Sequence, residues 1–212
     1  MKTIAYISSV ISFLPAVIAV LKLKSAGTKF RLILLYFILC CITEVCSLII
    51  ISNHGNNNLL ADIFYLTEGL LLITYYQLTF NEKEFRYPYY LLFGSYLLFG
   101  LYTTLVDPGP EAYNSTFRTG ESLIIQALAG YSLIRISKQS DFSLMKNPEF
   151  WFSAGFFTYF SVGIAIFFTA TFIFDESKHF MVKTWIIHSV VNIMANFVFA
   201  YGLYCIPSKK IV

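Results

Sequence analysis

Long apolar stretches are the feature that most constrains what this chain can fold into. Seven of them, each close to the roughly 20 residues that a helix needs to cross a bilayer, are separated by short polar segments. They cover residues 3–21, 30–51, 59–80, 87–106, 117–136, 150–174 and 181–205. They are continuously apolar, whereas the strands of a transmembrane barrel are short and alternate between apolar and polar residues. We therefore predict an all-α membrane protein, a bundle of seven transmembrane helices.

The composition agrees with this prediction. Of the 212 residues, 57% are hydrophobic and only 13% are charged, which is about half the charged share of an average soluble domain. A soluble domain of this length could not bury so much apolar surface. The composition thus excludes a soluble enzyme, a nucleic-acid-binding protein and a disordered chain. No segment between the stretches is long enough to fold separately, so we expect residues 1–212 to form one transmembrane domain.

The distribution of basic residues predicts the orientation, because cytoplasmic loops of membrane proteins are enriched in lysine and arginine. The first, third and fifth loops and the C-terminal tail carry Lys22, Lys24, Lys29, Arg31, Lys83, Arg86, Arg135, Lys138, Lys146, Lys209 and Lys210. The other side carries Lys2, Arg118, Lys178 and Lys183. The N-terminus is therefore expected outside and the C-terminus in the cytoplasm.

Four of the ionisable residues within the apolar stretches stand out, because a charged group well inside a membrane is costly and usually functional. They are Glu44, Glu68, Glu121 and His188. A helical rise of about 1.5 Å per residue puts them between about 6 and 14 Å from the outer end of their helices. All four are thus expected in the outer half of the membrane.

Neighbouring polar residues extend this group. His188, Asn192 and Asn196 are spaced four residues apart, which puts them on one face of a helix. Arg118 precedes Glu121 by three residues, and Tyr65 precedes Glu68 by three. Together these side chains predict an outward-opening polar pocket. The candidate pocket residues are Glu44, Glu68, Glu121, His188, Asn192, Asn196, Arg118 and Tyr65.

A purely structural role is the alternative for each of these residues. The three glutamates could be protonated and hydrogen-bonded to a neighbouring helix, and the two asparagines could join helices. A single histidine in a helix is more often a packing residue than a ligand.

Three functional classes fit a polar intramembrane pocket. The favoured one is a receptor or sensor for a small polar or cationic ligand, with a cytoplasmic or membrane-bound signalling partner. The second is a membrane-embedded hydrolase or lipid-modifying enzyme, in which Glu44, Glu68, Glu121 and His188 would be the candidate ligands of a divalent metal. The third is a proton-coupled transporter. Retinal is not expected, because a retinal protein needs a lysine deep in the seventh helix, and Lys183 lies only two residues inside the last stretch. No catalytic residue is assigned.

The chain also resembles a group of small seven-helix membrane proteins of Bacteroidetes. The residues that carry the resemblance are Pro148 to Phe152, Tyr159 to Ser161, Trp185 to His188, Asn192, Asn196, Gly202, and Arg118 with Glu121 and Ser122. It covers nearly the whole chain. It implies the seven-helix topology and a single domain, and no activity or catalytic residue is carried over from it. We expect this multi-pass protein in the inner cell membrane.

Overall fold

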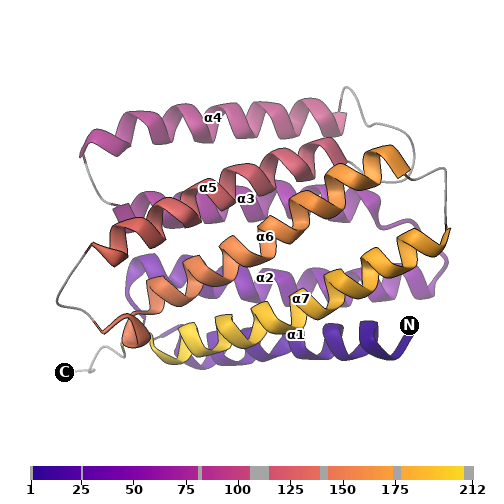
Figure 1. Ribbon diagram of the computed structural model, residues 1–212, viewed down its shortest axis with the longest axis horizontal. Coiled ribbons are helices and arrows are strands. Elements are labelled where there is room, and N and C mark those ends of the chain that lie inside the picture. The colour runs from indigo at the N-terminus through magenta and orange to yellow at the C-terminus, as the bar shows by residue number, and fades with distance from the viewer. Residues whose placement is uncertain are drawn as a thin grey trace.

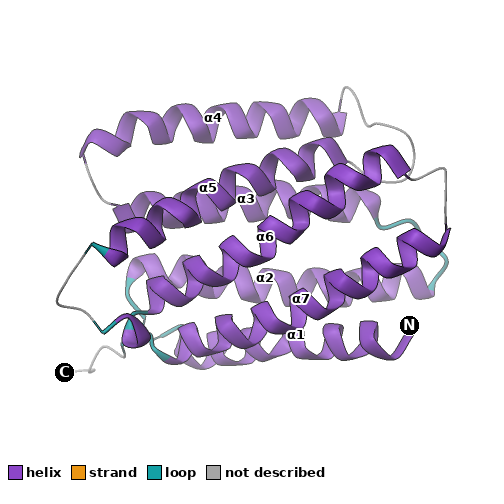
Figure 2. Cartoon of the chain, viewed as in Figure 1, coloured by secondary structure: helices purple, strands orange, loops and turns teal. Residues whose placement is uncertain are grey.

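The computed structural model describes residues 2–24, 26–80, 83–105, 115–138, 143–173 and 178–207. This part of the chain forms seven α-helices and one short 3-10 helix and contains no strand (Figure 2). The α-helices are α1 (Lys2–Lys22), α2 (Thr28–Ser52), α3 (Asn58–Phe80), α4 (Lys83–Leu105), α5 (Ser115–Ser137), α6 (Pro148–Ile173) and α7 (Lys178–Tyr204), with the 3-10 helix η1 (Leu144–Lys146) before α6. The prediction of an all-α chain is confirmed.

The helices begin and end within four residues of the limits that the apolar stretches predict. The last residues of two predicted stretches, 106 and 174, lie outside the described residues, as do Lys209 and Lys210 of the basic tail. Pro148 is the first residue of α6, a position where proline costs little because its missing N–H would have no partner within the helix.

Successive helices alternate in direction (Figure 1). α1 packs against α2 and α7, α3 against α2 and α5, and α6 against α5 and α7. These six helices form a closed ring. α4 lies outside it and packs mainly against α3 (Figure 1). We call the two ends of the molecule the α2–α3 end, where α2 ends and α3 begins, and the α1–α2 end, where α1 ends and α2 begins.

The apolar core lies toward the α1–α2 end. Phe37 of α2, Phe156 of α6 and Phe199 of α7 are buried together, and the ring of Phe199 lies 5.1 Å from that of Phe37 and 4.7 Å from that of Phe156. Such aromatic contacts add to the stability gained from burying the rings. Polar residues gather instead on the other side of this layer, nearer to the α2–α3 end.

Basic side chains bind the ends of helices at the α1–α2 end. The Lys22 ammonium donates to the carbonyl oxygens of Tyr204 and Ile206, at 2.7 and 3.0 Å. Arg135 donates to the carbonyl of Phe80, the last residue of α3, at 2.9 Å. Carbonyls at a helix C-terminus have no partner within the helix, so these bonds satisfy them and suit the helix dipole.

The outer surface of the described part is strongly apolar. Leu21, Leu98, Leu59 and Met194 are each at least 60% exposed. Four helical segments are long and apolar enough to cross a membrane: Thr28–Ser52, Asn58–Phe80, Pro148–Ile166 and Lys183–Tyr204. The apolar helix Tyr6–Lys22 is shorter. An apolar surface of this extent, with helices of this length, indicates a membrane protein.

Candidate functional site

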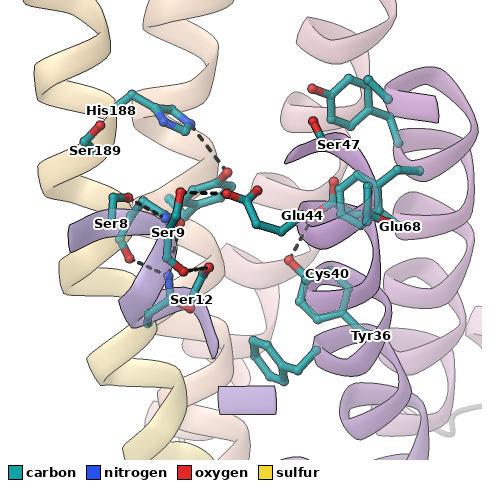
Figure 3. A pocket seen from close by; sticks show the side chains of 18 of the residues that line it. Ser8, Ser9, Ser12, Tyr36, Cys40, Glu44, Ser47, Glu68, His188 and Ser189 are labelled. Carbon is teal, nitrogen blue, oxygen red and sulfur yellow. Dashed lines mark hydrogen bonds between the residues drawn. The ribbon is translucent and has the colours of Figure 1, made fainter. Parts of the chain in front are cut away.

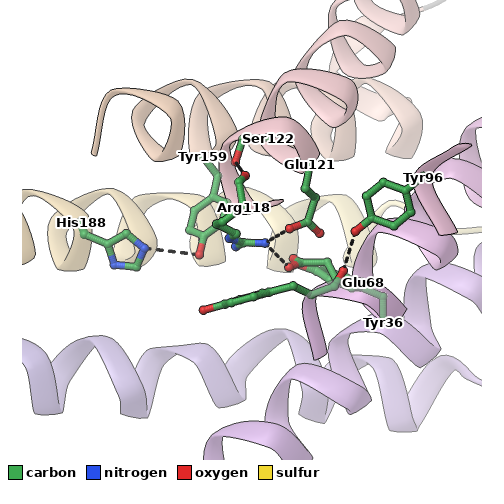
Figure 4. Close-up of polar contacts among 9 residues, drawn as sticks. Tyr36, Glu68, Tyr96, Arg118, Glu121, Ser122, Tyr159 and His188 are labelled. Carbon is green, nitrogen blue, oxygen red and sulfur yellow. Dashed lines mark hydrogen bonds and ion pairs between the residues drawn. The ribbon is translucent and has the colours of Figure 1, made fainter. Parts of the chain in front are cut away.

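A cavity of about 390 Å³ lies inside the ring of six helices, toward the α2–α3 end. Side chains from α1, α2, α3, α5, α6 and α7 line it (Figure 3). Seven of the eight candidate pocket residues are among them: Glu44, Tyr65, Glu68, Arg118, His188, Asn192 and Asn196. The eighth, Glu121, is not among the lining residues but forms an ion pair with Arg118 (Figure 4). Residues that the sequence singled out on four separate helices, α2, α3, α5 and α7, therefore meet around one space.

Arg118 lies between two glutamates on one side of the cavity (Figure 4). Its Nη1 is 2.6 Å from Oε2 of Glu68 and 2.5 Å from Oε2 of Glu121. The three residues are 3%, 1% and 0% exposed, respectively. The contact to Glu121 joins two positions of α5 that are three residues apart, whereas the contact to Glu68 joins α5 to α3. We call these three residues the buried ion cluster.

Aromatic side chains complete the surroundings of the buried ion cluster. The hydroxyl of Tyr36, on α2, donates to Oε1 of Glu68 at 3.0 Å. The guanidinium carbon of Arg118 lies 4.2 Å from the ring centroid of Tyr65, which is cation–π geometry. Burying an ion pair in a low dielectric is favourable only when additional contacts offset the lost hydration. Here the phenol and the ring supply such contacts.

The structure corrects one of the two predictions made for Arg118. Arg118 was grouped with the basic residues of the outer side, but its side chain is almost fully buried. A lone arginine would be excluded from such a place, and two carboxylates within 2.6 Å make its burial possible. The outer-side group therefore contains one exposed charge fewer, which strengthens the asymmetry of basic residues.

Glu44 lies apart from the buried ion cluster, on α2. Its Oε1 accepts a hydrogen bond from the hydroxyl of Ser9, on α1, at 2.6 Å (Figure 3). Among the residues that the structure describes, no lysine, arginine or histidine lies within ion-pair distance of Glu44. The side chain is partly exposed. The cavity thus contains a carboxylate that has no positive partner in the described structure.

The face of α7 supplies the opposite wall. Nε2 of His188 lies 3.5 Å from the hydroxyl of Tyr159, and the imidazole ring packs edge-on against Trp185, with centroids 5.6 Å apart. Asn192 donates to the hydroxyl of Ser8 at 2.9 Å. Asn196 donates to the carbonyl of Asn192 at 2.8 Å. Asn192 therefore joins α7 to α1, which is the structural role left open for it, while also lining the cavity.

Several lining residues were not singled out from the sequence. Ser8, Ser9 and Ser12 of α1 line the cavity, as does Tyr36 of α2. The spacing of Ser8 and Ser12 puts them on one face of an apolar helix, and this pattern could have revealed them. Tyr36 gave no signal, because it is one of 15 tyrosines and lies in a strongly apolar stretch.

The four candidate metal ligands lie in separate sets of contacts. Glu68 and Glu121 bind Arg118, Glu44 accepts from Ser9, and His188 contacts Tyr159. Within the described residues, no three or more side chains of histidine, cysteine, aspartate or glutamate are grouped so that they could hold a metal ion. The side chains that line the cavity include carboxylate, guanidinium, hydroxyl, thiol, amide, imidazole and aromatic groups. Such a set can bind a small polar molecule by hydrogen bonds, by charge and by ring contacts.

No protein-family model, curated protein or solved structure matches the chain.

Proposed function

We propose that the protein is a receptor or sensor of the inner cell membrane that binds a small polar or cationic ligand in the cavity. All seven helices α1 to α7 cross the bilayer in this proposal, with the N-terminus outside and the C-terminus in the cytoplasm. The α1–α2 end then faces the cytoplasm, and the cavity opens outward at the α2–α3 end.

The basic residues support this orientation. Lys24, Lys29, Arg31, Lys138 and Lys146 all belong to segments at the α1–α2 end. On the positive-inside rule this end is cytoplasmic.

α5 is the helix that most needs an explanation as a membrane span, because it contains Arg118, Glu121 and Gln126. The first two are buried in the ion cluster, and Gln126 donates to the hydroxyl of Ser161 on α6, at 2.7 Å. The polar side chains of α5 therefore turn inward, where their contacts offset the cost of leaving water. Leu123, Tyr131 and Ile134 of the same helix are exposed and are suited to contact lipid.

The single observation that carries the proposed function is the cavity itself. Its volume of about 390 Å³ falls within the range of about 300–1,000 Å³ that is typical of small-molecule sites. The walls combine aromatic rings with many polar side chains, so they offer a polar ligand both ring contacts and hydrogen bonds. A bound ligand would contact α1, α2, α3 and α7 together and change how these helices pack. Such a change would alter the cytoplasmic loops that a signalling partner contacts.

Blocking the cavity tests this proposal. Ala61 lines the cavity, whereas Ile63, two residues further along α3, is 54% exposed on the outer surface. The Ala61→Trp variant fills the cavity and Ile63→Trp is the matched control. The purified protein in nanodiscs is screened by thermal shift against small polar and cationic compounds. We expect compounds that stabilise the unmodified protein and Ile63→Trp but not Ala61→Trp. Compounds that stabilise all three proteins equally, or a screen without any stabilising compound, would count against a ligand site here.

A further inference from the structure

We infer that the cavity binds an organic monocation, whose ammonium group pairs with Glu44 rather than with the buried ion cluster. This inference rests on the proposed function and names the ligand class of the same site. Two glutamates line the cavity, Glu44 and Glu68, and their surroundings differ. Glu68 has a guanidinium partner, and Glu44 has none among the described residues.

The charges around the cavity favour a cation. The charged side chains that line the cavity are Glu44, Glu68 and Arg118, which together carry two negative charges and one positive charge when ionised. The described lining contains no lysine. A concave site with low-dielectric walls and an excess of one sign concentrates ions of the other sign. An anionic ligand would meet Glu44 without a compensating base, since Arg118 is already held by two carboxylates.

The geometry of Glu44 leaves room for a ligand. A carboxylate offers about four lone-pair directions, and in the described structure Glu44 accepts one hydrogen bond, from Ser9. The hydroxyls of Ser8, Ser12 and Ser47 lie on the surrounding walls (Figure 3). An ammonium group has three donors and no acceptor. It can therefore pair with the Glu44 carboxylate and use its remaining donors on hydroxyl oxygens.

The apolar part of the lining favours an organic cation over a bare metal ion. A hard metal ion needs several oxygen ligands around it, six to eight for calcium, and carboxylates commonly supply part of them. The described residues contain no group of three or more histidine, cysteine, aspartate or glutamate side chains that could hold a metal ion. Phe37, Phe64, Tyr65, Trp185 and Phe199 instead line the cavity with rings. These rings can hold the apolar body of an amine.

The protein already holds one organic cation in this way. The guanidinium of Arg118 lies over the ring of Tyr65, at 4.2 Å, while it is paired with carboxylates. A ligand ammonium at Glu44 would combine the same two interactions, an ion pair and aromatic contact. Glu68 is then a residue that keeps α3 and α5 together, and Glu44 is the residue that recognises the ligand.

Charge-selective labelling of a single thiol measures the preference for cations. Ser12 lines the cavity, so Ser12→Cys is introduced into a chain whose four cysteines, Cys40, Cys41, Cys46 and Cys205, are replaced by alanine. The rates of reaction with cationic aminoethyl and anionic sulfonatoethyl methanethiosulfonate are compared, each divided by its rate with a free thiol. We expect the cationic reagent to be favoured about tenfold, within the range that a focused field produces. The preference should fall several-fold in Glu44→Gln.

Asp62 provides the matched control for Glu44. It is a carboxylate near the same end of the molecule, on α3, and does not line the cavity. Asp62→Asn removes the same charge, and the ratio of the two rates should stay within about twofold of the parent protein, because Asp62 lies outside the cavity lining and salt screens its charge. An equal loss of preference in Asp62→Asn and Glu44→Gln would overturn the assignment to Glu44.

Protection by a ligand identifies its class. Labelling of Ser12→Cys by the uncharged methyl methanethiosulfonate is measured with benzylamine, which is protonated at neutral pH, with the uncharged benzyl alcohol, and with potassium or calcium chloride. We expect benzylamine to slow labelling several-fold, and to lose this effect in Glu44→Gln but not in Asp62→Asn. Equal protection by benzyl alcohol, or protection by the inorganic salts alone, would overturn the inference.

The outcomes separate this inference from the proposed function. Labelling by all reagents at equal rates, without protection by amines, leaves an open cavity but not a cation site. A thiol at position 12 that no reagent reaches contradicts the open cavity itself, and with it both proposals.

Discussion

Replacement of Arg118 by methionine is the sharpest test of the buried ion cluster. Methionine replaces the aliphatic stem of arginine and has no charge, so Arg118→Met leaves Glu68 and Glu121 without their cation. Both glutamates are at most 1% exposed, so neither carboxylate is hydrated as it would be on the surface. Breaking a buried ion pair by removing one partner costs about 3–5 kcal/mol. At roughly 2–4 °C of melting temperature per kcal/mol for a chain of this size, the expected loss is about 6–20 °C.

The assay is thermal unfolding of the purified protein in detergent, with two comparison variants. Arg86→Met removes an arginine whose side chain is exposed on α4, and should change the free energy of unfolding by less than about 0.5 kcal/mol. The triple variant Arg118→Met, Glu68→Gln, Glu121→Gln removes the two unpaired charges together with the cation. It should recover at least half of the stability lost in Arg118→Met. An Arg118→Met protein as stable as Arg86→Met would refute the argument that the cluster is buried and coupled.

Two further predictions concern helix contacts. Gly69→Ala should destabilise the protein by about 1–3 kcal/mol, because a Cβ at this position would overlap the Tyr96 side chain, whose hydroxyl donates to the carbonyl of Tyr65. In the control Gly94→Ala, the new Cβ meets nothing within 4 Å, so this variant should be neutral or more stable by up to about 1 kcal/mol. Equal melting temperatures of the two variants would contradict the close approach of Gly69 and Tyr96. Lys22→Met should lower the free energy of unfolding by about 1–2 kcal/mol, because the carbonyls of Tyr204 and Ile206 lose a charged donor. Lys24→Met is the control and should have little effect in the same thermal unfolding assay. Similar shifts in melting temperature for both variants would show that the hydrogen bonds at the end of α7 do not stabilise the protein.

The helices could be predicted because their signal is local. A run of about 20 apolar residues is a property of consecutive positions, and the helix limits followed it within four residues. The lateral order of the helices could not be predicted in the same way. α4 is less apolar than most helices of the ring but more apolar than α5, which belongs to the ring. Apolarity alone therefore does not show that α4 lies outside it.

The sequence was enough to predict which residues lie near one another in the candidate site, but not which residues they contact. Glu44, Glu68 and His188 share a depth in their helices, and depth follows from helical rise. Their partners depend on which helices are neighbours. Arg118 and Glu68 are 50 positions apart, so their pairing, which separates the role of Glu68 from that of Glu44, required the structure. Ser8 and Ser12 were missed because short hydroxyl side chains commonly bond to their own helix, as Ser12 does with the carbonyl of Ser9.

The most direct test of the central claim, a cavity open to the outside of a membrane protein, is labelling from one side of the membrane at a time. Ser47 lines the cavity near the end of α2, and Lys24 is exposed at the α1–α2 end. Single cysteines at these positions are treated with a membrane-impermeant thiol reagent in spheroplasts and in inverted inner-membrane vesicles. We predict that Ser47→Cys is labelled in spheroplasts and Lys24→Cys in inverted vesicles. Labelling of Ser47→Cys only in inverted vesicles, or in neither preparation, would contradict the account.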